Sequence, residues 1–319
     1  MDILFCCVSV VGCVLGIGFL TGKELTLFFG NANALAVSVC FFFLFFAICF
    51  LFLRLGKRYG CDDVTSLNDI LFDKGANVFS FVFVLTCFLV CAVMLAGVQS
   101  LWCGVTGKNF CFSLLLALFC SLSLSFGVRT VKKIGFALVP LVVILFFVVL
   151  LPAFDGFVGK GFCLVDFVRV AKYVCFNCML GASVFLSCGK SLCKGKALVV
   201  ALCSSLVLSA MIFLVLSIGG GDMPVIDVAK NSGVYLLFVF VLTGGVATAL
   251  CCCSYTVVEW LDKKLCCKKL SVAVVYICAY VTSLFGFGKM LGFVLPVSST
   301  FALVFVFCAI SKMYQKDNG

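Results

Sequence analysis

Histidine is absent from this sequence of 319 residues, and only 11% of its residues are charged. Because histidine is missing and no CxxC pair is matched by a second one, the sequence predicts no metal site and no bound cofactor. A soluble domain of this length needs far more polar surface, and 65% of these residues are hydrophobic, so the composition excludes a soluble protein. No GxxxxGKS or GxxxxGKT motif occurs, so any active transport would be driven by a gradient or by a partner.

The charged residues that are present include 23 Lys and Arg against 13 Asp and Glu. They are thinly spread between apolar runs, which is typical of loops that set orientation in a bilayer rather than of a surface that binds nucleic acid. Most of the 24 cysteines fall inside apolar segments, where cysteine behaves as a small apolar residue. We expect the cysteines beside charged loops to be reduced thiols.

Ten segments are long and apolar enough to cross a bilayer, whose core of about 30 Å needs about 20 residues of helix. Charged or glycine-rich breaks separate them. They lie at roughly 3–22, 33–54, 77–103, 110–127, 134–152, 170–188, 197–219, 234–258, 270–286 and 291–311. The sequence thus predicts an all-α polytopic membrane protein, embedded in lipid and without a soluble domain.

Basic residues are unequally divided between the loops on the two sides of these segments. Sixteen Lys and Arg follow the even-numbered segments, and seven lie on the other side. The positive-inside rule therefore predicts two cytoplasmic termini, which agrees with an even number of spans. The N-terminus carries neither the positive region nor the cleavage site of a secretory signal, so we expect the first segment to remain in the mature protein. The expected localisation is the plasma membrane.

The first segment contains four glycines in the stretch 12–22, followed by Lys23 and Glu24. Each glycine weakens a helix by about 1 kcal/mol relative to alanine. Clustered glycines let the backbone open beside a cavity and offer its N–H and C=O groups to a ligand. Close helix packing is the alternative, and Glu24 could be an interfacial carboxylate that Lys23 neutralises. The nearby Thr21 and Glu24 favour a site.

The sixth segment carries Asn177, Gly181 and Ser183 within seven residues. Interruptions at corresponding positions of two five-helix halves indicate an inverted-repeat transporter. The alternative is a packing face of small residues with one hydrogen-bonded Asn. Other polar groups in the spans are sparse, and Gln99, Thr243 and Thr248 stand out. Threonine hydroxyls in membrane helices commonly bond to their own helix, which competes with ion binding.

At these residues the sequence resembles a known group. The stretch Gly16-Ile17-Gly18-Phe19-Leu20-Thr21-Gly22-Lys23-Glu24, followed by Phe28-Phe29-Gly30, is similar to the "GxGFxSGxE…FF" opening of YkvI-type bacterial membrane proteins. Further similarities follow in order along nearly the whole chain, at Met94-Leu95-Ala96-Gly97, Asn177, Val184, Met223-Pro224, Thr248, the stretch 286–292 and Pro296. That family is placed in the amino acid–polyamine–organocation superfamily.

The resemblance implies a LeuT-like fold of five-plus-five inverted repeats, with residues 1–152 and 153–319 as the two repeats of one membrane domain and with helices 1 and 6 broken. It also implies small organic solutes as substrates, namely amino acids or related amines. This chain departs from the family pattern at Lys23, where Gln is usual. Sodium-coupled relatives present paired hydroxyls in helix 8, whereas here Ala247 precedes Thr248.

The leading hypothesis is a secondary transporter that works by alternating access. Exposed N–H groups near Gly16–Gly18 would bind a carboxylate or another anionic group. The candidate substrate residues are Gly16, Ile17, Gly18, Phe19, Thr21, Gln99, Asn177, Gly181 and Ser183. The candidate residues for Na⁺ or H⁺ coupling are Thr248, Thr243 and Glu24.

The rival hypothesis is a ligand-sensing permease-like subunit of the germinant-receptor type, which detects small molecules without productive transport. An enzyme is the weakest option, because the sequence has no histidine, no matched acid pair deep in a span and no nucleophile elbow. The oligomeric state is not readable from the sequence.

Overall fold

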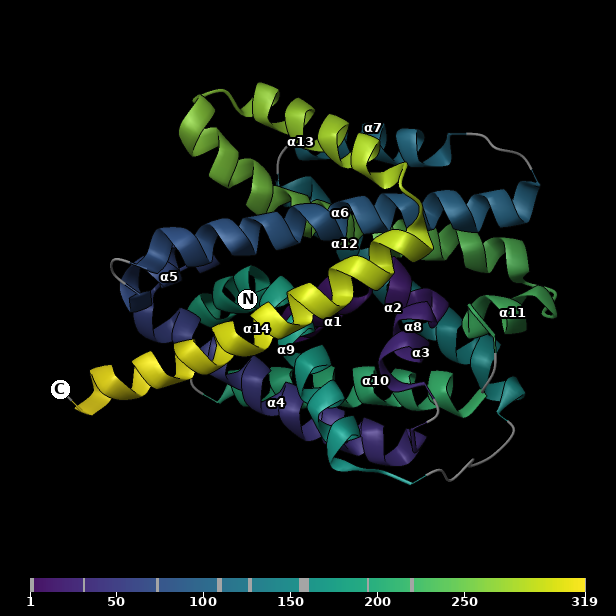
Figure 1. The fold of residues 1–319 in the computed structure, drawn as a ribbon, viewed down its shortest axis with the longest axis horizontal. Helices are drawn as coiled ribbons and strands as arrows, with labels where there is room; N and C mark the ends of the chain where they lie inside the picture. The colour runs from purple at the N-terminus through teal and green to yellow at the C-terminus, as the bar shows by residue number, and fades with distance from the viewer. Residues whose placement is uncertain are drawn as a thin grey trace.

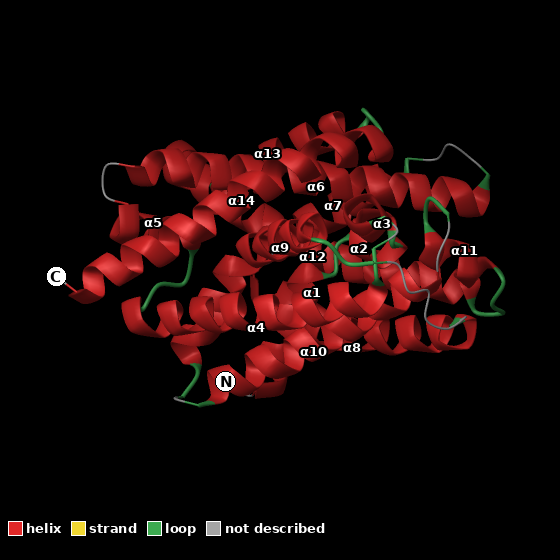
Figure 2. Ribbon diagram, turned by 60° about the horizontal axis from the view of Figure 1, so that its bottom comes forward, coloured by secondary structure: helices red, strands yellow, loops and turns green. Residues whose placement is uncertain are grey.

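The computed structural model describes residues 3–30, 32–72, 75–107, 111–125, 128–154, 161–193, 195–218 and 221–318. Of the basic residues that set the predicted orientation, Lys74, Lys108, Lys160 and Lys194 lie outside these ranges. Every regular element in the described part of the chain is helical (Figures 1 and 2). This agrees with the all-α class predicted from the apolar pattern.

The first predicted span, 3–22, is formed by two short helices, α1 (Ile3–Val14) and α2 (Ile17–Thr21), and a third, α3 (Lys23–Phe29), follows it directly. Each later predicted span is covered by one helix. These are α4 (Ala34–Tyr59), α6 (Ala76–Thr106), α7 (Phe112–Ser125), α8 (Val128–Leu150), α9 (Leu164–Ser191), α10 (Lys196–Ile218), α12 (Tyr235–Leu265), α13 (Lys268–Ser283) and α14 (Phe287–Asn318). The connecting helices are α5 (Val64–Phe72), η2 (Leu151–Ala153) and α11 (Pro224–Lys230).

Seven of these helices are long and apolar enough to cross a membrane: α4, α6, the 135–153 segment of α8 with η2, α9, α10, α12 and the 287–311 part of α14. The outward faces are apolar too, since Phe43, Phe240 and Phe307 are each more than 60% exposed. A surface of this kind is stable in lipid and unstable in water. The chain is therefore a multi-pass membrane protein.

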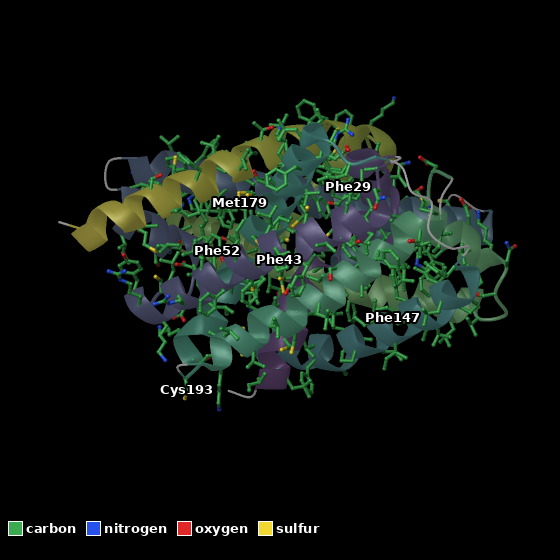
Figure 3. The ribbon with its side chains drawn as sticks, turned by 90° about the horizontal axis from the view of Figure 1, so that it is seen from below. Phe29, Phe43, Phe52, Phe147, Met179 and Cys193 are labelled. Atoms are coloured by element: carbon green, nitrogen blue, oxygen red, sulfur yellow. The ribbon has the colours of Figure 1, made fainter. Side chains whose placement is uncertain are left out.

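The centre of the bundle holds α1, which packs against α8, α9, α10 and α12. Figure 2 shows α9 and α12 between α6, α13 and α14 on one side and α4 and α10 on the other. Figure 3 shows Phe52 and Met179 inside the bundle, where both are fully buried, while the exposed Cys193 lies in a loop at its edge. The interrupted first span thus lies in the middle of the molecule.

Helices α4 and α9 approach so closely that glycine is required on both. A Cβ on Gly56 would lie 2.2 Å from the Leu186 carbonyl oxygen, and a Cβ on Gly189 would lie 2.0 Å from that of Leu53. The two helices also end on the same face, because Lys57 Nζ donates to the Leu192 carbonyl oxygen at 2.9 Å. This contact fixes α9 relative to the first half of the chain.

The prediction of a broken sixth span is wrong. Helix α9 runs without interruption from Leu164 to Ser191. Gly181 serves packing, because a Cβ there would lie 2.7 Å from both Cys13 Sγ and the Phe185 ring. Asn177 stays within the helix by donating from Nδ2 to the Tyr173 carbonyl oxygen at 3.0 Å. The packing face that the sequence left as an alternative is what the structure shows.

Candidate functional site

The predicted interruption of the first span is confirmed, and its backbone geometry explains it. Helix α1 ends at Val14, and Gly16 is extended with φ −75° and ψ 168°. Gly16 N–H donates to the Val14 carbonyl oxygen at 2.7 Å, which closes a tight turn. The chain then resumes as α2, whose first turn begins without intrahelical acceptors for its N–H groups. The first N–H groups of α2 therefore lie inside the bundle without an acceptor from their own helix.

A second interruption at Gly22 turns the chain from α2 into α3. Gly22 has φ +80°, the left-handed region that favours glycine, and its Cβ position would lie 2.7 Å from the Pro224 ring. Residues that follow this turn point in different directions, because neighbours on a helix are about 100° apart. Lys23 and Glu24 are consequently separated.

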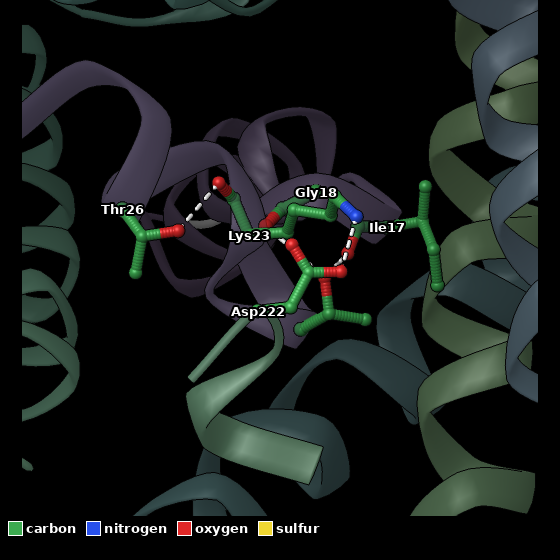
Figure 4. A network of polar contacts seen from close by, with 6 residues as sticks. Ile17, Gly18, Lys23, Thr26 and Asp222 are labelled. Atoms are coloured by element: carbon green, nitrogen blue, oxygen red, sulfur yellow. Dashed lines mark hydrogen bonds and ion pairs between the residues drawn. The ribbon is translucent and has the colours of Figure 1, made fainter. Parts of the chain in front are cut away.

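Lys23 is held by the loop before α11. Its Nζ pairs with Asp222 Oδ2 at 2.5 Å (Figure 4). The same Nζ lies 5.5 Å from the centre of the Phe287 ring. The Lys23 side chain is mostly buried, since only 12% of it is exposed. The interpretation in which Lys23 neutralises Glu24 does not match this geometry.

Glu24 turns back over α2 instead. A Cβ on Gly18 would lie 2.6 Å from Glu24 Oε2 and 2.9 Å from Glu24 Cβ, so a side chain at position 18 would require Glu24 to shift. Glu24 is 7% exposed. Among the described residues, no hydrogen bond or ion pair reaches its carboxylate. A buried carboxylate without a partner is costly, which makes it a candidate functional group.

A small cavity of about 30 Å³ lies between the first span and α9. Its wall includes Gly16, Ile17 and Gly18 of the interruption, Glu24 of α3 and Asn177 of α9. The remaining wall is mostly apolar, with Met94 of α6 lying 3.3 Å from the Cβ position of Gly16. The cavity has the volume of about one water molecule.

A larger cavity of about 780 Å³ lies on the other side of α1, and Cys13 belongs to the walls of both cavities. Ser183 of α9 and Thr248 of α12 line it. It reaches the surface at the end of the bundle where α4, α9 and α12 finish, because Asp62 and Lys263 in its wall are exposed.

One carboxylate of the larger cavity lies in the loop after α4. Burial raises the pKa of Asp63, but hydrogen bonds from Ser66 N–H at 2.9 Å and from the Thr65 hydroxyl at 2.9 Å outweigh it. With Lys263 4.0 Å away, the pKa of Asp63 is lowered below its ordinary value. This group is ionised and paired, unlike the unpartnered Glu24.

The other predicted site residues lie away from the small cavity. Thr21 donates to the Ile17 carbonyl oxygen at 2.8 Å, and the neighbouring Phe19 is fully buried in the core. Thr248 donates to the Gly245 carbonyl oxygen at 2.7 Å. These hydroxyls bond to their own helices, which was the alternative to ion binding.

Two predicted residues form hydrogen bonds between helices. The Gln99 side-chain oxygen accepts from Ser113 N–H at 3.0 Å and ties α6 to α7. Thr243 accepts from Trp102 Nε1 at 2.9 Å and donates to the Val239 carbonyl oxygen at 2.8 Å. Neither residue belongs to the wall of either cavity.

The sequence did not reveal two features of the site, namely the partner of Lys23 and the apolar wall of the small cavity. Asp222 was not linked to Lys23, because the two are 199 positions apart and no local pattern connects them. The sequence also did not assign Met94, Phe176 and Leu291 to the wall of the site, because apolar residues at a cavity have the same composition as apolar residues elsewhere in the core.

No protein-family model matches the chain, and neither does any curated protein. Solved structures are similar to it over nearly its whole length. MhsT in complex with L-phenylalanine has a TM-score of 0.71 at 16% identity, covering 98% of this chain and 92% of MhsT. A Na⁺-coupled sialic acid symporter in a substrate-bound outward-open state has a TM-score of 0.66 at 12% identity, covering 96% and 75%.

Mhp1, a nucleobase-cation-symport-1 family transporter with bromovinylhydantoin bound, has a TM-score of 0.58 at 9% identity, covering 97% of this chain and 75% of Mhp1. At such low identity the likeness establishes the fold alone. Together with the interrupted first span in the centre of an apolar bundle, it shows that this multi-pass membrane protein has the LeuT-like fold.

Proposed function

We propose that this protein is a secondary transporter that moves a small organic solute across the plasma membrane by alternating access. The observation that carries the proposal is the interruption at Leu15–Gly16, buried beside a cavity that also contains an unpartnered carboxylate. Irregular backbone at membrane depth is tolerated where it lines a cavity, and transporters place their ligands there. The symporters that share the fold support the same conclusion.

The proposed topology has ten spans in two inverted repeats, residues 1–152 and 153–319, with both termini cytoplasmic. Ion pairs between loops support the alternation. Lys190 after the sixth span pairs with Asp62 after the second, and Lys263 at the end of the eighth lies 4.0 Å from Asp63. On the other face, Lys23 after the first span pairs with the loop after the seventh. Loops that follow even-numbered spans therefore meet at one end of the bundle, and loops that follow odd-numbered spans meet at the other.

The structure corresponds in this proposal to an inward-facing state. The large cavity reaches the surface at the end that carries the larger share of basic residues, which the positive-inside rule places in the cytoplasm. At the opposite end, the Lys23–Asp222 pair and the packing of Gly22 on Pro224 close the path to the small cavity. A conformational change that closes the end now open and opens the end now closed would move the solute across the membrane.

The proposed substrate class is amino acids or related amines, bound at Gly16–Gly18 and Asn177. Two coupling ions are possible within this proposal. Sodium would bind at Thr248 beside the α1 backbone, since Thr248 shares the large cavity with Gly12 and Cys13. A proton would instead be carried by Glu24 in the small cavity.

Uptake into proteoliposomes tests the proposal. Folded protein should accumulate at least one amino acid or amine when a sodium or proton gradient is imposed, and the gradient that is required identifies the ion. Gly18→Ala should reduce uptake, because its Cβ would lie 2.6 Å from Glu24 Oε2 and would displace the Glu24 side chain. Gly104→Ala on α6 is the matched control, since its Cβ meets nothing within 4 Å.

Folded protein that takes up none of the compounds under either gradient would contradict transport. Retained solute binding under those conditions would favour a sensing subunit instead.

A further inference from the structure

The small cavity is lined by an acidic side chain, which is unusual for a site expected to bind a carboxylate. Among the described residues of its wall, Glu24 is the only acidic or basic side chain, and Asn177 is the only other polar side chain apart from Cys13. The rest of the wall is apolar or glycine, including Val90, Met94 and Leu295. When Glu24 is ionised, it therefore sets the electrostatic potential of the cavity and favours a cation.

The basic residue that adjoins Glu24 in the sequence is paired elsewhere. Lys23 adjoins Glu24 in sequence, but its Nζ is 2.5 Å from Asp222 and faces the Phe287 ring. Only 7% of Glu24 is exposed, and in the described part of the chain it has no hydrogen-bonding partner. A buried carboxylate of this kind is stabilised strongly by a cation that arrives with a ligand.

The position of Glu24 also disfavours a substrate carboxylate. The N–H groups that would attract such a group belong to the first turn of α2, which includes Gly18. Glu24 Oε2 lies against Gly18, 2.6 Å from its Cβ position. A second carboxylate at this turn would be placed within a few ångströms of the first, and like charges at that distance repel strongly at low dielectric.

We infer that Glu24 is the binding partner of a substrate ammonium group, and that the protein prefers a small primary amine with an apolar body to the corresponding amino acid. This inference rests on the proposed transport function. The cavity volume of about 30 Å³ fits one water-sized group such as an ammonium head, and Asn177 supplies an amide beside it. The apolar body would lie against the α6 and α14 residues of the wall, and the cavity must expand to admit it.

Matched pairs of compounds test the assignment in the purified full-length protein. Phenethylamine is compared with L-phenylalanine, and isoamylamine with L-leucine, by the ligand-induced shift in the thermal unfolding midpoint at constant ionic strength. Each amine should bind at least about tenfold more tightly than its amino acid. Glu24→Gln should weaken amine binding by about ten- to a hundredfold, which is the range for one charge-assisted hydrogen bond.

Two further variants separate charge from structure. Glu24→Asp keeps the charge and should retain measurable amine binding. If Glu24 had only a structural role, amine binding would be lost in both Glu24→Asp and Glu24→Gln. Asp69→Asn, at an exposed position on α5, makes the same carboxylate-to-amide change and should leave binding unchanged.

Three outcomes would overturn the inference. They are amine binding that is unaffected by Glu24→Gln, amino acids that bind as tightly as their amines, and stabilisation by sodium alone that requires Glu24. Uptake distinguishes this failure from failure of the proposed function. Gradient-driven uptake of amino acids in preference to amines would leave transport standing and remove the amine assignment.

Discussion

The close contact between α4 and α9 makes a quantitative prediction for Gly189→Ala. The new Cβ would lie 2.0 Å from the Leu53 carbonyl oxygen and 2.8 Å from Leu53 Cα, far inside van der Waals contact. Both atoms belong to the backbone, so no side chain can rotate away and the helices must separate by more than an ångström. A gap of that size forfeits a large part of the dispersion energy along the interface.

Overpacking of this kind costs about 3 kcal/mol at the upper end of the usual range, and alanine in a helix recovers about 1 kcal/mol relative to glycine. We therefore expect Gly189→Ala to lower the free energy of unfolding by about 2 kcal/mol. At roughly 2 °C per kcal/mol for a chain of this size, the unfolding midpoint should fall by about 4 °C.

The assay is thermal unfolding of purified protein in one detergent and at one scan rate. Gly104→Ala is the control, because the same substitution on α6 meets open space and should raise the midpoint slightly. Gly56→Ala should resemble Gly189→Ala, and the double variant should lose less than the sum, since the helices need to separate only once. A Gly189→Ala protein that melts at or above the wild type would refute the reasoning.

Two further predictions concern ion pairs at the ends of the bundle. Lys23→Asp should destabilise the end of the bundle where Lys23 and Asp222 pair, and the exchange Lys23→Asp with Asp222→Lys should recover part of the loss. The total effect on the free energy of unfolding should stay below about 1 kcal/mol, because Asp222 is 78% exposed. Equal midpoints for the single and the exchanged variants would refute the pairing. Asp63 has a lowered pKa, so its contribution to stability is present above the ordinary pKa of about 4 and is lost as the pH falls through the folded value. The difference in midpoint between wild type and Asp63→Asn should accordingly narrow below about pH 4, and a difference that is independent of pH would contradict this.

The fold was largely predictable because it depends on features that are local in sequence. Apolar length alone placed the spans from 33–54 onward within several residues of α4 to α14 at most ends. The interruption of the first span was predictable for a related reason, since glycine changes the backbone preference of its own position. Gly16 is extended and Gly22 is left-handed, as that preference allows.

Features that depend on tertiary contacts were not predictable. Gly181 resembles Gly16 in sequence, yet it lies within the unbroken helix α9, where Cys13 and Phe185 occupy the space that a side chain would take. Lys23 adjoins Glu24 in the chain, but the turn at Gly22 directs Lys23 to Asp222. The same limit applies to Gln99 and Thr243, whose polar groups bond to neighbouring helices that the sequence does not identify.

A structure with the transported solute bound would test the central claim most directly. We expect solute density between α2 and α9, in contact with Gly16, Gly18 and Asn177, with the small cavity enlarged beyond its present volume of about 30 Å³. Solute density confined to the large cavity, against Ser183 and Thr248 and away from the interruption, would contradict it.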